Sequence, residues 1–516
     1  MCDGARRAVM WTLIGLCAAL SGCQAKRRDP GTAVFLIESS PNSLDPRVGT
    51  DAQSERIDPL LFDGLVARDE HYQFQPALAA SWETPDALTL LFHLRHDVRF
   101  SDGRRLTAAD VLWTLESMRD GTILTPKGAS YDSVASVEAV DAWTVRIRLK
   151  EPDNFLLGNL SSSAMGIVPA GSRADFWRHP VGTGAFRLVS QETDKEVVVE
   201  RNPFAWERAT VPGALQRVRF EVVPDATTRA LELRKGAADI TSNSLPSDML
   251  PVLKRDPKLV VEETGGTPVQ YLAFNLRDPV LGRRVVRAAI AHAVDRRLLV
   301  RTLLGGEAQL AESLLPPTHW AYTDDVKRYD YDPAKARAML NAAGFPPGRD
   351  GVRLRLTMKT STDEGTRMLA VALQQQLAQI GIALEIRSME TATFFSDITR
   401  GAFQIYSLRW IGGNEQPDIF SYAFSTVRMP PHGANREHYA NAEVDRLLDA
   451  ASRVTEQQQR RADYVRVQQI LAEDLPMENL WYLNSILVHD RRVTGVKPSA
   501  SGDYLFLLNA KISSLQ

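Results

Sequence analysis

The sequence predicts an α/β protein built from more than one packed unit. Its 516 residues exceed the roughly 250–300 residues at which a single hydrophobic core stops growing. Hydrophobic residues make up 44% and charged residues 24% of the chain, as in ordinary globular proteins. Residues 352–389 alternate as a strand, continue as a helix and alternate again, which is the pattern of a parallel crossover. These observations place the chain in the α/β class.

The first 22 residues have the features of a removed signal peptide. Two arginines precede an apolar run over residues 8–20, which is too short to span a bilayer comfortably. Cys2 and Cys17 lie within this segment, so Cys23 is the sole cysteine expected in the mature chain. The mature protein therefore has no partner for an intramolecular disulfide.

The predicted signal peptide, residues 1–22, ends at a sequence that resembles the lipobox of bacterial lipoproteins. Leu-Ser-Gly-Cys at residues 20–23 would make Cys23 the acylated new N-terminus, followed by a polar tether over residues 23–29. The expected location is the cell envelope, on the periplasmic or extracytoplasmic face of a membrane. The alternative is a plain secretory signal with a coincidental cysteine.

The charge of the chain gives no sign of a nucleic-acid partner. The 61 basic and 63 acidic side chains leave a net charge of -2, without the basic excess that phosphate binding requires. No repeat of solenoid length and no later apolar stretch long enough to span a membrane is present.

The first part of the mature chain is rich in strands. Alternating hydrophobic residues, such as Leu90, Phe92 and Leu94, predict strands over residues 32–40, 88–100 and 144–150. Thr107 and Asp110 have the spacing of a capping box, which predicts a helix beginning beside them. Residues 180–186 have too few large side chains to pack and predict a crossover between units.

The middle of the chain alternates strands and helices. Residues 217–240 predict a strand, a break at Pro224 and a helix that ends at Gly236, and residues 269–276 predict another strand. Residues 283–306 predict one amphipathic helix, with an apolar face formed by Val286, Ile290, Val294 and Leu298.

A further helix has its cap residues written in the sequence. Asp332 is the predicted N-cap, Pro333 the first helical residue and Gly344 the stop.

The most informative stretch covers residues 352–410. It predicts a helix over residues 364–380 and strands over residues 352–358, 382–389 and 403–410. The last strand ends in Arg409 and Trp410, and the loop GGNEQP follows it. Because ligands in open α/β sheets lie beyond the carboxyl ends of the strands, this loop is predicted to line a ligand site.

Motifs in a fixed order run along almost the whole mature chain. They are SLDP at Ser43, PALAASWE from Pro76, LRHDVRFSDGRRLTAADV, VGTGAF at Val181, RNPFAW at Arg201, VVPDATTRALELRKGAADI, YLAFN ending at Asn275, VRAAIAHAVDR ending at Arg296, and YDPAKARAMLNAAGF. Together they resemble the solute-binding proteins of bacterial ABC importers, in the family that serves dipeptides, oligopeptides and nickel, extracellular solute-binding protein family 5.

The resemblance implies a two-lobed periplasmic-binding-protein fold, type II-like, with an extra domain on the first lobe. Lobe one would combine residues 30–65, 183–274 and 484–516, the extra domain residues 66–182, and lobe two residues 275–483. Two connections between the lobes favour closure over the ligand about a hinge.

The resemblance also implies what the protein binds. The expected ligand is a small peptide or peptide-like solute, the partners are the permease subunits of an ABC importer and the membrane, and the protein is a monomer. No cofactor and no catalysis are implied.

Trp410 matches the tryptophan that begins the family's ligand loop, although a core position at a strand end is the alternative. Peptide-binding members usually carry an aspartate three residues later, which pairs with the α-amino group of the peptide, whereas this chain has Gly413. The glycine predicts an N-blocked or otherwise modified solute whose polar groups meet backbone amides and Asn414. The alternative is that Glu415 or Asp418 acts as a substitute acid, unless both are solvated loop charges.

Other candidate ligand residues come from both lobes. Arg409 and Arg367 are candidates for pairing with an anionic group, although neighbouring strand residues face opposite sides and Arg409 should then point away from Trp410. Asn275 is a candidate donor from the hinge or, equally, a strand cap. Thr50 and Asp51 lie where peptide-binding relatives approach their ligand from the first lobe.

The histidines do not predict a metal site. His93 and His96 are three apart on a predicted strand and face opposite sides, while His432 and His438 lie in a polar loop without a third ligand. The alternatives left open are a lipoprotein sensor docking on a receptor, a nickel- or metallophore-binding relative, and an exported hydrolase. The hydrolase is disfavoured because the G-x-S-x-G, P-loop and H-E-x-x-H patterns are absent.

Overall fold

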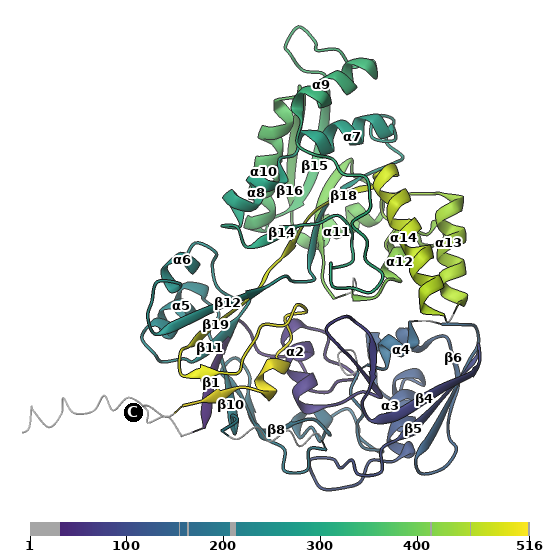
Figure 1. The fold of residues 1–516 in the computed structure, drawn as a ribbon, viewed down its shortest axis with the longest axis vertical. Coiled ribbons are helices and arrows are strands. Elements are labelled where there is room, and N and C mark those ends of the chain that lie inside the picture. The colour runs from purple at the N-terminus through teal and green to yellow at the C-terminus, as the bar shows by residue number, and fades with distance from the viewer. Residues whose placement is uncertain are drawn as a thin grey trace, which may run out of the picture.

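The computed structural model describes residues 31–153, 155–161, 165–206, 213–412, 415–454 and 456–513. Cys23, Gly413 and Asn414 of the sequence predictions lie outside the described residues. Figure 1 shows an upper lobe and a lower lobe, with a smaller sheet domain beside the lower one. Over the described ranges, the helices are all too short or too polar to cross a membrane.

The first lobe is built on a mixed sheet. Its strands lie in the order β12 (Leu259–Thr264), β19 (Ser485–Asp490), β11 (Ile240–Ser242), β1 (Thr32–Ile37), β10 (Arg217–Val222), β9 (Glu196–Arg201) and β8 (Phe186–Glu192). β1 runs parallel to β10 and β11 and is buried on both faces, with Phe35 in one core and Leu36 in the other. This explains its continuous hydrophobic run.

Helices and a small strand pair complete the first lobe. One face of the sheet packs on α2 (Ala52–Leu61), and the other packs on α5 (Ala226–Arg234) and α6 (Leu250–Leu253). Near the C-terminus, β20 (Val493–Thr494) pairs with β21 (Lys511–Ile512).

The extra domain has an antiparallel sheet of its own. Its strands lie in the order β4 (Ala79–Asp86), β5 (Thr89–Leu94), β7 (Thr144–Leu149) and β6 (Val134–Ala139). The hairpin of β2 (Val66–Arg68) and β3 (Phe74–Pro76) precedes them. The predicted alternation in β5 is confirmed, because Leu90, Phe92 and Leu94 are buried in one core with α3 (Ala108–Arg119) and α4 (Leu156–Asn159).

The predicted capping box at the start of α3 is confirmed. The Thr107 amide donates to the Asp110 carboxylate at 2.8 Å, and the Thr107 hydroxyl lies 3.0 Å from the same oxygen. This arrangement satisfies amide groups that the first helical turn would otherwise leave unpaired.

The second lobe has another mixed sheet. Its strands lie in the order β14 (Ala308–Leu310), β18 (Met477–Leu483), β13 (Val269–Phe274), β17 (Ile405–Trp410), β15 (Leu354–Ser361) and β16 (Ile382–Met389). The parallel crossover predicted over residues 352–389 is confirmed, because β15 and β16 pair in parallel and α10 (Glu364–Ala378) joins them.

Helices cover both faces of the second sheet, as Figure 1 shows. One face packs on α10 together with α7 (Arg284–Ala293), α8 (Arg296–Leu303) and α9 (Pro333–Ala342). The other packs on α11 (Thr391–Thr399), α12 (Ile419–Phe424), α13 (Ala442–Arg453) and α14 (Gln457–Asp474). The predicted cap of α9 is confirmed, because Asp332 accepts from the Lys335 amide and Gly344 has a positive φ of 84°.

The prediction of one helix over residues 283–306 is wrong. The segment forms α7 and α8, which are separated at Val294 and Asp295. Val294 is extended, and the Asp295 carboxylate accepts a hydrogen bond from the Leu298 amide at 2.8 Å, which caps a second helix. After this break Leu298 is 40% exposed. The hydrophobic spacing alone did not reveal a cap residue inside the pattern.

Two segments connect the lobes and lie against each other. β18 continues almost directly into β19, while residues 265–268 join β12 to β13. The Leu483 amide donates to the Pro268 carbonyl at 2.9 Å, and a Cβ at Gly266 would lie 2.1 Å from the Leu483 carbonyl oxygen. Because β13 pairs within the second sheet, the predicted boundary after residue 274 is one strand too late.

The prediction that residues 180–186 are too poor in side chains to pack is also wrong. The Gly184 amide donates to the Leu61 carbonyl at 2.9 Å, and the Gly182 carbonyl accepts from the Ser101 amide at 2.8 Å. A Cβ at Gly182 would lie only 2.0 Å from the Leu61 carbonyl oxygen. Their lack of side chains lets the glycines lie directly on the end of α2.

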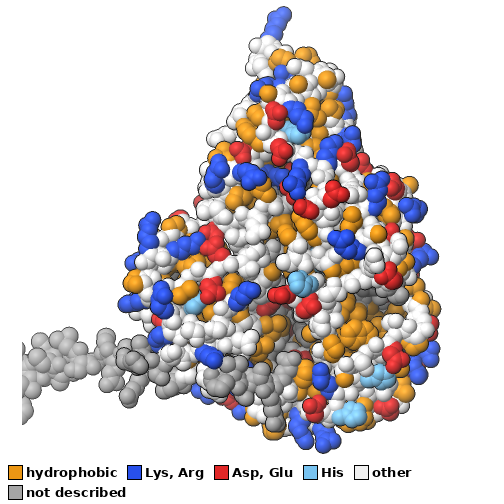
Figure 2. All heavy atoms as spheres, viewed as in Figure 1, with side chains coloured by type: hydrophobic (Ala, Val, Ile, Leu, Met, Phe, Trp, Pro, Cys, Tyr) orange, Lys and Arg blue, Asp and Glu red, His pale blue; other side chains and the backbone are white. Residues whose placement is uncertain are grey.

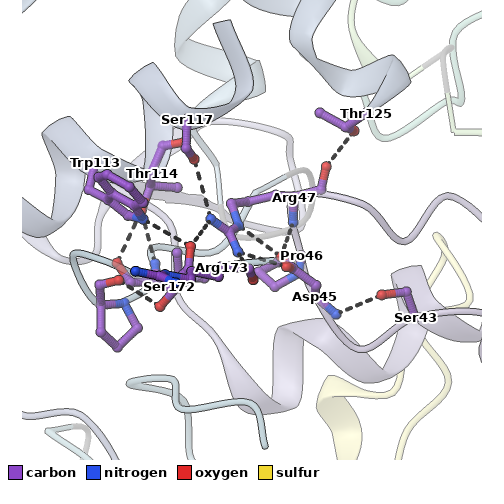
Figure 3. Close-up of polar contacts among 12 residues, drawn as sticks. Ser43, Asp45, Pro46, Arg47, Trp113, Thr114, Ser117, Thr125, Ser172 and Arg173 are labelled. Atoms are coloured by element: carbon purple, nitrogen blue, oxygen red, sulfur yellow. Dashed lines mark hydrogen bonds and ion pairs between the residues drawn. The ribbon is translucent and has the colours of Figure 1, made fainter. Parts of the chain in front are cut away.

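A fully buried arginine ties the first lobe to the extra domain (Figure 3). The Arg47 guanidinium donates to the two oxygens of Asp45 at 3.0 and 2.8 Å. Its remaining N–H groups reach the Ser117 hydroxyl on α3 and the Ser172 and Arg173 carbonyls at 3.3, 3.0 and 3.3 Å. Each guanidinium donor therefore has an acceptor, and the SLDP motif forms a structural clamp.

Candidate ligand site

β17 places Trp410 at the carboxyl end of the second sheet. β17 runs parallel to β15, so both strands end at the same edge. The Trp410 ring stacks on Tyr271 at 6.1 Å and meets Tyr422 edge-on at 6.3 Å. Its buried indole N–H finds no hydrogen-bond acceptor among the described residues, and the next residue, Ile411, is 69% exposed. Trp410 thus stands between the core and the surface and has an unused donor.

The two acids that follow are not solvated loop charges, and that alternative is wrong. Asp418 is 3% exposed, accepts a hydrogen bond from the Tyr464 hydroxyl at 2.6 Å and lies 3.8 Å from Arg460. The Glu415 side chain is 14% exposed, accepts from the Thr267 hydroxyl at 3.3 Å and lies 3.9 Å from Arg68. Asp418 is therefore held within the second lobe, whereas Glu415 faces groups outside it.

Burial controls the ionisation of both acids. It raises the pKa of Glu415 to about 7, because the opposing effect of Arg68 is partly offset by the negative charges of Asp503 and Glu55. Burial also raises the pKa of Asp418, although Arg460 and the Tyr464 hydroxyl oppose it. Glu415 is therefore a carboxyl group whose charge depends on its neighbours near neutral pH.

Glu415 lies at a junction between the second lobe and the extra domain. Arg68 ends β2 of the hairpin, and Tyr72 in the hairpin turn stacks on His319 of the second lobe at 5.3 Å. The Gln457 side-chain amide donates to the Gln73 side chain at 2.9 Å. Figure 2 shows acidic side chains beside a histidine at the level where the upper lobe meets the lower part of the molecule.

The two predicted arginines lie on the second lobe near the start of α10. Arg409 is exposed, and its Nε donates to the Gln270 side chain at 3.4 Å. Arg367 is exposed in the first turn of α10, where its amide donates to the carbonyl of Asp363, the helix cap. Asp363 also bears on Arg409, because the arginine helps to lower the pKa of that carboxyl. The two arginines therefore share one edge.

Asn275 is occupied by contacts within the second lobe. Its side-chain amide donates to the Gly401 and Phe403 carbonyls at 3.1 and 2.7 Å, and its side-chain oxygen accepts from the Arg277 amide at 3.0 Å. This is the geometry of the strand-capping alternative.

Thr50 and Asp51 lie at the start of α2 in the first lobe. Asp51 is the N-cap of α2 and accepts from the amides of Gln53 and Ser54, both at 3.1 Å. Thr50 is exposed. Asp51 is thus committed to the helix, while the Thr50 side chain remains accessible.

The structure adds residues to the junction that the sequence did not indicate. Arg68, Tyr72 and His319 come from two loops that are far apart in the chain and carry no common pattern. Burial lowers the pKa of His319 to about 3, so it is neutral. The described residues hold no group of three or more His, Cys, Asp and Glu side chains arranged to bind a metal ion.

Comparison with known proteins agrees with this architecture. Residues 73–429 match the bacterial extracellular solute-binding proteins, family 5, in their middle region. The chain is 29% identical over 509 residues to "Di/tripeptide-binding protein 1" of Pseudomonas aeruginosa (strain UCBPP-PA14), covering 92% of each chain.

Solved structures also resemble the chain. The periplasmic binding protein DppA from Helicobacter pylori, in complex with the peptide STSA, is 27% identical with a TM-score of 0.74, and 94% of this chain covers 98% of it. NikZ from Campylobacter jejuni, in complex with Ni(L-His), is 25% identical with a TM-score of 0.75, and 93% of this chain covers 99% of it.

The predicted two-lobed α/β fold is confirmed by these structures, as is the absence of an enzymatic role among the relatives. The match spans more than half of the chain and both lobes contribute to it. The chain therefore belongs to the bacterial extracellular solute-binding proteins of family 5, the substrate-binding proteins of ABC importers.

Proposed function

We propose that this protein is the lipid-anchored substrate-binding component of an ABC importer, which captures a peptide or peptide-like solute and delivers it to a permease. The observation that carries this proposal is the position of the loop after β17. Trp410, with its unused indole N–H, and Glu415 stand at the carboxyl end of the second sheet and meet groups of the extra domain. Such convergent polar and aromatic groups are typical of ligand sites.

Relatives support the class of solute. The similar proteins carry the names of di- and tripeptide, glutathione and heme binders, and one solved relative holds the peptide STSA. Peptides and glutathione share amide groups that Trp410 and backbone amides can recognise. A peptide-like compound is therefore the proposed solute of this chain.

The proposed mode of capture is closure of the lobes about their two connections. The close contact of Gly266 with Leu483 leaves a narrow crossing at which the lobes can rotate. A solute drives closure only by the difference between its affinities for the closed and open forms.

The test begins with the solute that the purified protein carries. Denaturing the mature protein and analysing the supernatant by mass spectrometry should release a peptide or peptide-like compound. X-ray scattering should then give a smaller radius of gyration when this compound is added back. Recovery of only a nickel chelate, or an unchanged scattering profile at saturation, would contradict the proposal.

Anchoring and delivery form the remaining part of the proposal. Stable attachment through Cys23 would need several acyl chains, because one chain binds a membrane only marginally. A Cys23→Ala protein should leave the membrane fraction, and retention after a high-salt wash would show that the anchor is elsewhere. Neighbouring permease and ATPase genes would favour transport over a sensor that docks on a receptor.

A further inference from the structure

The junction around Glu415 holds more negative than positive charge. Asp503 near the C-terminus and Glu55 on α2 both act on Glu415 from the first lobe, and each raises its pKa. Arg68 is the guanidinium that opposes them. Three carboxylates therefore converge where one arginine side chain provides the positive charge.

Other titratable groups near the junction do not restore the balance. His319 is neutral, and Tyr72 keeps its proton because burial raises its pKa. Lys127 acts on Glu55, but its ammonium donates to the Pro46 carbonyl at 2.8 Å and also faces the buried carboxylate of Asp58. The surplus negative charge thus remains at Glu415.

The Arg68–Glu415 contact is loose for a pair of this kind. The closest distance between the two groups, from Arg68 Nη1 to a Glu415 oxygen, is 3.9 Å, which is too long for a hydrogen bond. The Arg68 guanidinium also lies over the Phe74 ring, 5.5 Å from its centre, on its own hairpin. Arg68 can therefore retreat toward Phe74 without losing all of its contacts.

We propose that Glu415 receives a cationic group of the solute, an ammonium or a guanidinium, and that Arg68 occupies this position in the ligand-free protein. The proposal rests on the proposed function and specifies its solute. A cation that hydrogen-bonds directly to Glu415 replaces the long contact with Arg68, and the excess carboxylates then have a partner. The unused Trp410 N–H, on the same loop, offers a donor to a carbonyl oxygen of the same solute.

This assignment selects between the alternatives that the sequence left open. Asp418 is bonded to Tyr464 and Arg460 inside the second lobe and does not face the first. Glu415 is the acid in reach of both lobes. The solute is then a peptide or peptide-like compound with a free amine, rather than an N-blocked one.

Calorimetry at pH 8.5 with matched di- and tripeptides, each with a free or an N-acetylated amino terminus, tests the proposal. The wild-type protein should bind the free peptides at least about tenfold more tightly than the acetylated ones. Glu415→Gln should abolish this preference without weakening the acetylated peptides. Asp418→Asn is the matched control and should change the affinity for both forms by the same factor.

Arg68→Met distinguishes a placeholder from a structural partner. It should keep the preference for free peptides and leave their affinity unchanged or higher, because the competing guanidinium is gone. Loss of the preference, as in Glu415→Gln, would overturn the proposed role of Arg68. In the wild type, the affinity for free peptides should also fall as the pH is lowered through 7, because the Glu415 carboxyl takes up a proton.

The remaining outcomes separate this inference from the proposed function. Equal binding of free and acetylated peptides would overturn the role of Glu415 and leave peptide capture intact. Failure of the folded wild-type protein to bind any peptide of the panel would overturn both, and unchanged melting temperatures of the variants would show that binding, not folding, was altered.

Discussion

Two arginine–carboxylate pairs in this protein have opposite designs. In the Arg47–Asp45 pair the side chains are 0% and 2% exposed, and two hydrogen bonds of 3.0 and 2.8 Å join them. In the Arg68–Glu415 pair the side chains are 11% and 14% exposed, and the closest approach is 3.9 Å. The first pair lies within the lower part of the molecule, whereas the second joins the hairpin of the extra domain to the second lobe.

The difference shows what each pair must do. Arg47 and Asp45 are two residues apart, and carbonyls of the same rigid body complete the guanidinium's hydrogen bonds. Arg68 and Glu415 are carried by parts that must separate if a solute is to enter. A pair that is complete stabilises one structure, while a loosely paired acid keeps capacity for a ligand.

Removing Arg47 should have the largest effect. Arg47→Met leaves the buried Asp45 carboxylate unpaired and should lower the free energy of unfolding by about 3–5 kcal/mol. Arg68→Met is the control, and at pH 6, where Glu415 is largely protonated, it should cost less than about 1 kcal/mol. Urea unfolding of both variants checks this. Equal losses would break the comparison.

A pH titration should give the next largest effect. The pKa of Glu415 is raised from 4.5 to about 7 in the folded protein, so its contribution to stability is present below pH 4.5 and is lost as the pH rises to about 7. The loss is at most about 3 kcal/mol. Glu415→Gln should be free of it.

Two other buried acids require that the titration be read as a difference. Burial also raises the pKa of Glu437 and of Glu478 to about 7, so the wild type loses stability at these groups as well. The stability of Glu415→Gln minus that of the wild type should therefore rise between pH 4.5 and 7. A flat difference would mean that Arg68 compensates the burial of Glu415 fully.

The smallest effects should come from the neutral partners of the two pairs. Ser117→Ala removes an acceptor of the buried Arg47 guanidinium and should cost about 1–2 kcal/mol in thermal unfolding. Thr267→Val removes the hydroxyl that donates to Glu415 and should cost less than about 1 kcal/mol, while raising the pKa of Glu415 further. An opposite order of the two losses would contradict the distinction between the pairs.

Much of the fold was predictable because its signals are local. The capping box of Thr107 and Asp110, the cap of α9 and the parallel crossover of β15 and β16 each depend on residues close together in the chain. Where local signals competed, the prediction failed. At Asp295 a cap residue interrupts an apolar spacing, and the spacing alone suggested a continuous helix.

The candidate site was predictable only on the side of the second lobe. Trp410 and Glu415 follow a recognisable strand, so their place at its carboxyl end could be inferred. The sequence alone did not distinguish a solvated Glu415 from a buried one, because burial depends on what packs over the loop. Arg68 and Tyr72 had no signal, since a short hairpin carries no sign of the loop it will meet.

The sequence by itself determined the class of fold, most of its elements and the family, because these depend on periodicity, caps and motif order along the chain. Tertiary structure alone decided the state of the charges. It made Arg47 a complete clamp and left Glu415 buried beside a distant arginine, because the pKa of a carboxyl and the partners of a guanidinium depend on groups brought together from separate lobes.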